Sequence, residues 1–190
     1  AGLRRAEAEG VTVWRRGAEG PVGLAGRALA AAGMHWSRNR LENAVAMRDA
    51  LREVAERVEL DLVELPECGA EGLLLDAVEP ARRIVRFHSP AELIQPFYPT
   101  PRRDAALCAR LERRALARAG AWTSCSRFLA DAASRFALPA PIAVVPNGVD
   151  LEVADAGIDA DPRAWLELPA RQRFVLFCGR VERRKGAHLL

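Results

Sequence analysis

The chain has 190 residues, of which 50% are hydrophobic and 28% are charged, and its formal net charge is +3. This hydrophobic content excludes a disordered protein, and the length allows one domain or slightly more. Every apolar stretch is shorter than the ~18 residues that a membrane-spanning helix needs, and no signal peptide is visible. The composition therefore predicts a soluble globular protein.

The charged residues give no sign of a nucleic-acid partner. One arginine-rich stretch has no interleaved aromatic residues, which the stacking of bases would require. We therefore interpret it as the solvated face of a helix; it contains Arg102, Arg103, Arg110, Arg113, Arg114 and Arg118.

The cysteines have neither metal-ligand nor redox spacing, so the sequence predicts no metal site. Because their neighbours are mostly apolar, we expect buried free thiols in a protein of a reducing compartment. They are Cys68, Cys108, Cys125 and Cys178.

The first part of the chain predicts a short strand between two helical segments. Residues 1–10 are charged and are expected to end a helix and form a turn. The β-branched run 11–14 predicts a strand, and residues 24–32 predict a weak helix.

A longer helix is expected after a loop that holds His35 and Trp36. Asn39 is followed three residues later by Glu42, which is the spacing of a helix-capping pair. The helix then extends to about Val58.

The middle of the chain alternates apolar, strand-like runs with helical segments. Thr100 before Pro101 predicts one capped helix start, and Ser126 predicts another. Since strands alternate with helices, the sequence predicts an α/β fold with a doubly wound parallel sheet. The expected strands are 61–65, 83–87, 121–124 and 142–145, and the expected helices are 73–78, 101–118 and 126–136.

Polar side chains follow two of these strands. Glu67 and Glu71 lie in the loop after the strand at 61–65, and His88 follows the strand at 83–87. The carboxyl ends of parallel strands meet at one edge of the sheet, where α/β proteins bind their ligands. A plain structural interpretation stays open, with the glutamates as exposed loop charges and the histidine as a turn residue.

The last part of the chain contains two motifs, one after the other. The first is Val-Pro-Asn-Gly-Val-Asp, which ends at Asp150, and the second is Phe-Cys-Gly-Arg-Val-Glu-Arg-Arg-Lys-Gly, which ends at Gly186. A buried strand at 174–178 that turns through glycine into a helix would present backbone N–H groups to an anion. Arg180 and Lys185, the only lysine in the chain, would add positive charge there.

With these motifs the chain resembles the GT-B glycosyltransferases of family 4, the glycosyl transferases group 1 type. The resemblance extends back through residues 119–129 and more loosely to about Asp61. It implies two Rossmann-like domains that face each other across a cleft. It also implies a nucleotide-sugar donor, held mainly by the C-terminal domain, and transfer with retention of anomeric configuration.

The resemblance also assigns roles to residues. Arg180 and Lys185 match the family's diphosphate-binding positions, and His88 matches a catalytic histidine near the transferred sugar. Glu67 and Glu71 become candidate contacts to the sugar or the acceptor. Arg183 and Arg184 lie between the two matched cations, where many relatives are not basic, and we interpret them as surface residues.

The resemblance further divides the chain into an N-terminal acceptor-side domain, a linker and the beginning of a nucleotide-sugar-binding domain. The expected ranges are 1–150, incomplete at its start, 151–173 and 174–190, with an interdomain turn at Asn147, Gly148 and Asp150. The family's two glutamates, separated by seven residues, would fall beyond Leu190. We therefore expect this stretch alone to be inactive.

The expected function is transfer of a sugar to a glycan, lipid or small-molecule acceptor in polysaccharide or glycoconjugate synthesis. The nucleotide-sugar is a substrate, so no cofactor is expected. A cytoplasmic location is expected, with peripheral contact to the inner face of the membrane left open, and the oligomeric state is open as well. Two alternatives remain: a non-catalytic nucleotide-binding module, and a Rossmann-type oxidoreductase, although no Gly-x-Gly-x-x-Gly follows any strand.

Overall fold

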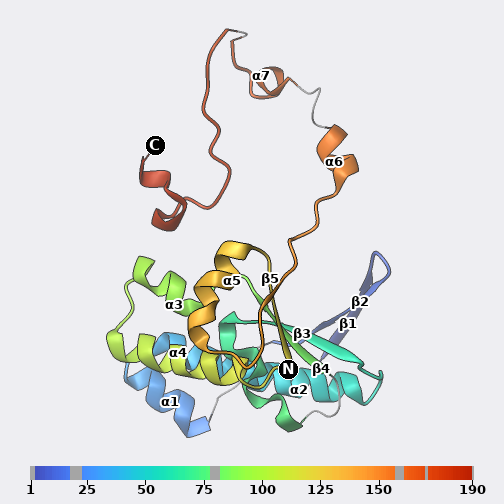
Figure 1. Cartoon of the computed structure of the whole chain (residues 1–190), viewed down its shortest axis with the longest axis vertical. Helices are drawn as coiled ribbons and strands as arrows, with labels where there is room; N and C mark the ends of the chain where they lie inside the picture. The colour runs from blue at the N-terminus through green and yellow to red at the C-terminus, as the bar shows by residue number, and fades with distance from the viewer. Residues whose placement is uncertain (1–2, 18–22, 78–81, 157–160, 170, 190) are drawn as a thin grey trace. The chain divides into compact units, whose positions relative to one another are not determined.

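The computed structural model describes residues 3–17, 23–77, 82–156, 161–169 and 171–189 (Figure 1). The chain divides into two compact units, Ala1–Pro146 and Asn147–Leu190. The first unit contains every strand of the described residues and the longer helices. Each unit is described by itself below.

The first unit begins with a β-hairpin that is separate from the main sheet (Figure 1). Strand β1 (Arg4–Ala8) pairs antiparallel with β2 (Val11–Arg15). The two residues between them, Glu9 and Gly10, both have positive φ, as a tight hairpin turn requires. The strand expected at 11–14 is confirmed, but the helix end expected within residues 1–10 is wrong. The exposed sequence of β1 carries no apolar pattern that would have indicated a strand.

Two helices follow the hairpin. Helix α1 (Gly23–Ala31) confirms the weak helix expected there, and α2 (His35–Ala55) packs against it. The start of α2 at His35 corrects two expectations, the loop at His35 and Trp36 and the capping pair of Asn39 with Glu42. Instead, the Asp104 carboxylate accepts hydrogen bonds from the backbone N–H groups of Trp36 and Ser37, at 2.9 and 2.8 Å.

The main sheet has four parallel strands in the order β3-β4-β5-β6. This confirms the α/β class and the parallel sheet, and every strand expected between residues 61 and 145 is present. The strands are β3 (Leu62–Pro66), β4 (Arg82–Phe87), β5 (Ala121–Ser124) and β6 (Ala143–Val144).

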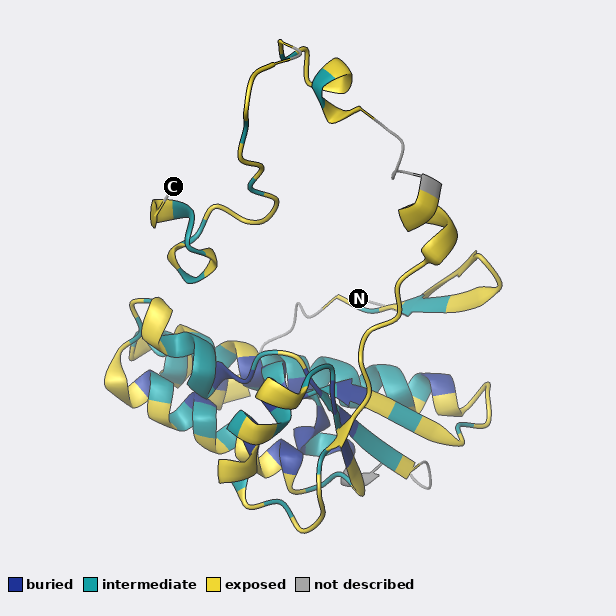
Figure 2. Ribbon diagram, turned by 45° about the horizontal axis from the view of Figure 1, so that its top comes forward, coloured by how far each residue is buried: buried dark blue, intermediate teal, exposed yellow. Residues whose placement is uncertain are grey.

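One face of this sheet forms the core. Leu65, Val85 and Trp122 are paired neighbours on β3, β4 and β5, and all three are buried. They pack against Leu116 and Leu129 from the helices that follow the strands. Figure 2 shows buried residues, in dark blue, in the strands and in the helices packed on them. Residues of the opposite face, including Leu62, Glu64, Arg82 and Ala121, are exposed.

The connections between the strands carry helical segments that pack on the core. Ser126 caps α5 through the backbone N–H of Leu129, at 3.2 Å, as expected. The cap expected from Thr100 is wrong, because Pro101 occupies the cap position of α4 and no side chain caps that helix. The segments are the 3₁₀ segment η1 (Cys68–Ala77), α3 (Ala91–Ile94), η2 (Gln95–Phe97), α4 (Arg102–Leu116), α5 (Arg127–Ala133) and η3 (Ser134–Phe136).

The second unit consists of short helical segments joined by extended chain. They are α6 (Leu151–Ala156), α7 (Pro162–Trp165), η4 (Arg183–Lys185) and η5 (Ala187–Leu189). None of its described residues is buried, and Figure 2 shows it almost entirely in the exposed and intermediate colours. The buried strand expected at 174–178 is therefore wrong. A strand is stabilised by pairing, and this apolar run forms no strand pairing among the described residues.

Candidate active site

Glu67 and His88 lie at the carboxyl ends of the neighbouring strands β3 and β4, as the sequence predicted. The backbone N–H of Glu67 donates to the carbonyl of Arg86, so the pairing of the two strands continues one residue past β3. The side chain of His88 is exposed at this edge. Parallel strands thus bring the two residues together at the sheet edge where α/β proteins bind ligands.

The carboxyl group of Glu67 is buried, which corrects its interpretation as an exposed loop charge. Only 2% of the residue is exposed, and its Oε1 accepts a hydrogen bond from the backbone N–H of Ser89. Burial raises the pKa of Glu67, and the backbone N–H groups of His88 and Ser89 oppose that shift. Its Oε2 has no hydrogen-bond partner among the described residues. Glu67 therefore holds the loop after β4 and keeps one oxygen for further bonding.

A second buried carboxylate, that of Glu112 on α4, supports both loops of this edge. Its Oε1 accepts the backbone N–H of Gly69 at 3.1 Å, and its Oε2 accepts that of Ala91 at 3.2 Å. Arg40 on α2 neutralises it, with Nε 2.9 Å from Oε1. No sequence pattern indicates this role, because Glu112 lies in an arginine-rich stretch that is typical of a solvated helix face.

Glu71 lies farther along η1 and is half-buried. Burial raises the pKa of its carboxyl group. Glu71 lines a pocket of about 490 Å³. The other described residues that line it come from β2, the residue after it, and α2: Trp14, Arg15, Arg16, Asn43, Ala46, Met47 and Ala50. The structure therefore places Glu71 in the wall of a pocket that is open to solvent.

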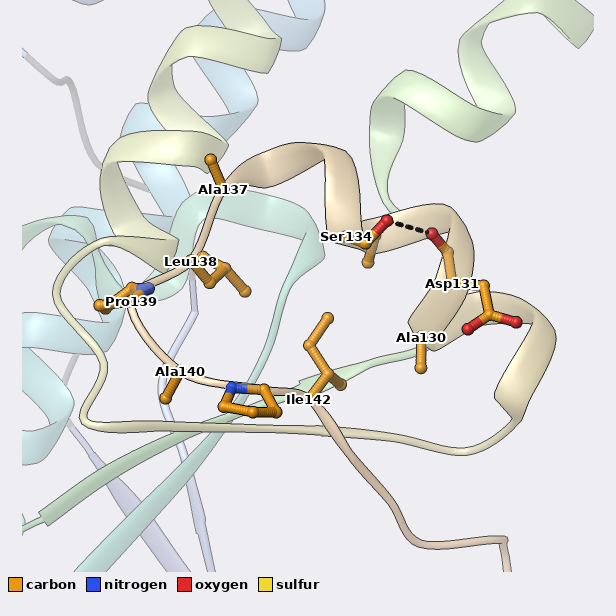
Figure 3. Close-up of a pocket in the computed structure, with 10 residues that line it drawn as sticks. Ala130, Asp131, Ser134, Ala137, Leu138, Pro139, Ala140 and Ile142 are labelled. Atoms are coloured by element: carbon orange, nitrogen blue, oxygen red, sulfur yellow. Dashed lines mark hydrogen bonds between the residues drawn. The ribbon is translucent and has the colours of Figure 1, made fainter.

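A second pocket, of about 450 Å³, lies between α5, η3 and the chain that leads into β6 (Figure 3). Its lining consists mostly of alanine and proline with Leu138 and Ile142. The polar side chains are those of Asp131 and Ser134, and the Ser134 hydroxyl donates to the Asp131 carbonyl at 2.6 Å. This pocket lacks the convergent polar groups of a substrate site.

The second unit holds the two cations that the sequence assigned to a phosphate site. Arg180 is largely exposed, and its Nη2 lies 3.3 Å from Oε1 of Glu182. The same oxygen lies 2.8 Å from Nη2 of Arg184, so Arg184 is an ion-paired, half-buried residue and not a free surface charge. Lys185 is exposed and makes no ion pair with a described residue.

The backbone near these cations differs from the expected helix start. Residues Arg183–Lys185 form one 3₁₀ turn, and Gly186 ends it in a left-handed conformation with φ 77°. The turn expected at Asn147 and Gly148 is not formed, since residues 145–150 have no turn and Gly148 does not have a positive φ. Asp150 instead caps α6 by accepting the backbone N–H groups of Glu152 and Val153.

Among the described residues, no group of three or more His, Cys, Asp or Glu side chains is placed to hold a metal ion. None of the described helices combines the length and the apolar content that crossing a membrane requires.

The parallel sheet, with polar side chains at the carboxyl ends of adjacent strands, defines a Rossmann-like α/β protein. The family model described as Glycosyltransferase Family 4 matches residues 4–153, and the chain belongs to this family. The expected family is thereby confirmed.

One curated relative is similar to a short part of the chain. It is named D-inositol 3-phosphate glycosyltransferase and comes from Nocardiopsis dassonvillei. The two sequences are 47% identical over 49 residues. The match spans 26% of this chain and only 11% of the relative's length.

Proposed function

We propose that the protein is a retaining glycosyltransferase that moves a sugar from a nucleotide-sugar donor to an acceptor. The family match over residues 4–153 is the observation that carries this proposal. Retention and the nucleotide-sugar donor follow from the resemblance of the second motif to family 4. The donor is a substrate, and the proposed reaction needs no separate cofactor.

In this proposal, residues 174–190 begin the donor-binding domain, and Arg180 and Lys185 bind the donor diphosphate. When the diphosphate leaves, negative charge grows on its oxygen, and fixed cations stabilise that charge in the transition state. Two observations support the assignment. The Lys185 ammonium has no ion-pair partner among the described residues, and Arg180 is largely exposed beside a carboxylate that Arg184 also binds.

The first unit supplies the acceptor side, with His88 near the transferred sugar. The exposure of His88 at the carboxyl end of β4 supports this role, because the side chain is accessible to a ligand. Glu67 acts as a positioning residue, since its carboxylate holds the backbone of the His88-Ser89 loop.

Calorimetry with a nucleoside diphosphate on the complete protein tests the donor site. A charge-assisted hydrogen bond contributes about 1.5–3 kcal/mol, so Lys185→Ala and Arg180→Ala should each weaken binding about ten- to a hundredfold. Arg183→Ala is the matched control, because this exposed arginine lies in the same turn, and it should change the affinity by about threefold at most. Unchanged binding of Lys185→Ala would show that the diphosphate assignment is wrong.

Two further measurements separate this function from the alternatives. Saturable binding of NAD in preference to nucleoside diphosphates would favour an oxidoreductase. Binding of the diphosphate without turnover of any nucleotide-sugar would favour a non-catalytic module. For a competent enzyme, His88→Ala should lower kcat strongly while the melting temperature stays close to that of the parent.

The name of the Nocardiopsis relative suggests an acceptor class to test first. That protein is named for a phosphorylated inositol. We propose that the acceptor of this protein is also a polyhydroxylated small molecule, and acceptor assays should therefore begin with cyclitols, hexoses and their monophosphates.

A further inference from the structure

Helix α4 separates its charged side chains by sign. Both of its acidic residues, Asp104 and Glu112, are buried and hydrogen-bonded within the protein. Its arginines are exposed, as the sequence predicted for a solvated face: Arg102, Arg103, Arg110, Arg113 and Arg114. The outer face of this helix, all of whose residues are described, therefore carries positive charge and no carboxylate of its own.

Three of these arginines form a line without partners. Arg110 follows Arg103 by seven residues and Arg114 follows Arg110 by four, and such spacings place side chains on one side of a helix. At a rise of about 1.5 Å per residue, the line is about 16 Å long. None of the three makes a side-chain hydrogen bond or ion pair with a described residue. Their charges are therefore available to a ligand.

The positions between these arginines leave room for a second helix. Ala106 and Ala117 are exposed on the same side of α4, and their small side chains let another backbone come close. Arg103, Arg110 and Ala117 follow one another at seven-residue spacing, which is the repeat by which helices pack along each other. The line of charges thus has the form of a helix-packing surface.

The same helix already binds a carboxylate with a neighbouring arginine. Nε and Nη2 of Arg113 donate to the two carboxylate oxygens of Glu92, at 2.6 and 2.9 Å. This is the two-pronged geometry in which guanidinium groups bind carboxylates. Nη2 of Arg135 lies 3.9 Å from the same carboxylate, so two arginines share one negative charge and the flank of α4 stays positive.

We propose that the outer face of α4 docks an acidic helix of a partner protein, whose carboxylates pair with Arg103, Arg110 and Arg114. Charge complementarity requires an anionic partner, and free charges along one line fit a rod-shaped partner better than a flat one. The contact goes beyond the proposed sugar transfer, because it uses none of the residues assigned to the donor or the acceptor.

Two other anionic partners fit this face less well. A helix that binds a membrane surface needs large apolar side chains beside its basic ones, whereas Leu116 of α4 is buried in the core. Single-stranded nucleic acid is bound by aromatic side chains that stack on the bases, and α4 contains no aromatic residue.

Fluorescence anisotropy of the complete protein with a labelled synthetic helix tests the proposal. The probe is an alanine-based peptide of about 20 residues, long enough to be helical, with glutamates at i, i+4, i+7 and i+11. This spacing matches the three arginines in either direction of the peptide. The control peptide carries the same glutamates spread around the helix. The patterned peptide should bind about tenfold more tightly than the control, and its affinity should fall as salt is added.

Charge reversal on α4 should abolish that preference. The triple variant Arg103→Glu, Arg110→Glu, Arg114→Glu should weaken binding of the patterned peptide about tenfold or more, because three attractive pairs become repulsive. Arg110→Gln removes one charge only, and it should weaken binding about two- to fivefold. This single variant decides if the triple variant does not fold.

A second triple variant controls for net charge. Arg4→Glu, Arg27→Glu, Arg52→Glu changes the net charge by the same amount at exposed arginines of β1, α1 and α2. It should change the affinity about threefold at most, since exposed charges farther from the peptide are screened by salt.

Three results would overturn the proposal. The first is equal affinity for the patterned and the control peptide, and the second is an equal loss in the two triple variants. The third is tighter binding to vesicles of phosphatidylglycerol and phosphatidylcholine, or to a DNA duplex, than to the peptide, with the same dependence on the α4 arginines. That result would assign the face to a membrane surface or to nucleic acid instead.

Discussion

Arg40 and Glu112 form a buried ion pair that joins α2 to α4. Nε and Nη2 of Arg40 each lie 2.9 Å from Oε1 of Glu112, and the two side chains are 10% and 5% exposed. The remaining capacity of the carboxylate is used by the backbone of Gly69 and Ala91. The pair therefore has the additional hydrogen bonds that a buried pair needs to be tolerated.

Replacement of one partner should be strongly destabilising. Glu112→Gln leaves the charge of Arg40 buried, and we expect the free energy of unfolding to fall by about 3–5 kcal/mol in urea denaturation. The control is Glu92→Gln, since Glu92 pairs at 2.6 Å with Arg113, whose side chain is 57% exposed. That change should cost less than about 1 kcal/mol. Equal losses in the two variants would contradict the role assigned to Glu112.

Asp104 should be the residue on which the start of α2 depends. Its carboxylate accepts two backbone N–H groups and the hydroxyl of Ser37, so Asp104→Ala should lower the free energy of unfolding by about 2 kcal/mol or more. Asn39→Ala, at the cap position that the sequence suggested, should change it by about 0.5 kcal/mol at most. Thermal unfolding followed by circular dichroism compares the two, and a larger loss for Asn39→Ala would refute the cap.

These two cases show what the sequence allows to be predicted. The cap at Ser126 was predictable because its partner lies three residues away, whereas the cap from Asp104 and the pair of Arg40 with Glu112 join residues far apart in the chain. The parallel strands were predictable from their apolar runs and from the glycine and proline residues between these runs. The run at 174–178 has the same pattern but pairs with no strand of the described residues, so the pattern alone does not predict its structure.

Glu67 should make the stability of the protein depend on pH. Its pKa is raised by burial above the ordinary value of 4.5, so the native state binds its proton more tightly than the unfolded state does. The stability contributed by the protonated form is complete below 4.5 and is lost as the pH rises through the native pKa. Glu67→Gln cannot lose this proton. The stability of Glu67→Gln relative to the parent should therefore be higher at neutral pH than at pH 4. A stability difference that does not change with pH would contradict the raised pKa of Glu67.

The four thiols should differ in their rates of alkylation. The expectation that all are buried is wrong, because Cys178 is exposed and only Cys108 is fully buried. Burial raises the pKa of Cys108 to about 12 and that of Cys68 to about 11, so neither forms much thiolate at pH 8. Mass spectrometry after a short alkylation should find Cys178 modified first and Cys108 last. Cys178→Ser should remove the fast phase, and rapid native labelling of Cys108 would count against its burial.

The order of the strands has a consequence for how the sheet assembles. Each of β3, β4 and β5 pairs with the strand that follows it in the chain, so none of these described strands has to be inserted between two that are already paired. The sheet can grow at one edge, in the direction in which the ribosome releases the chain, and each addition closes only the connection just synthesised. A nascent chain that has emerged through β5 can already bury Val85 against Trp122, before β6 is available.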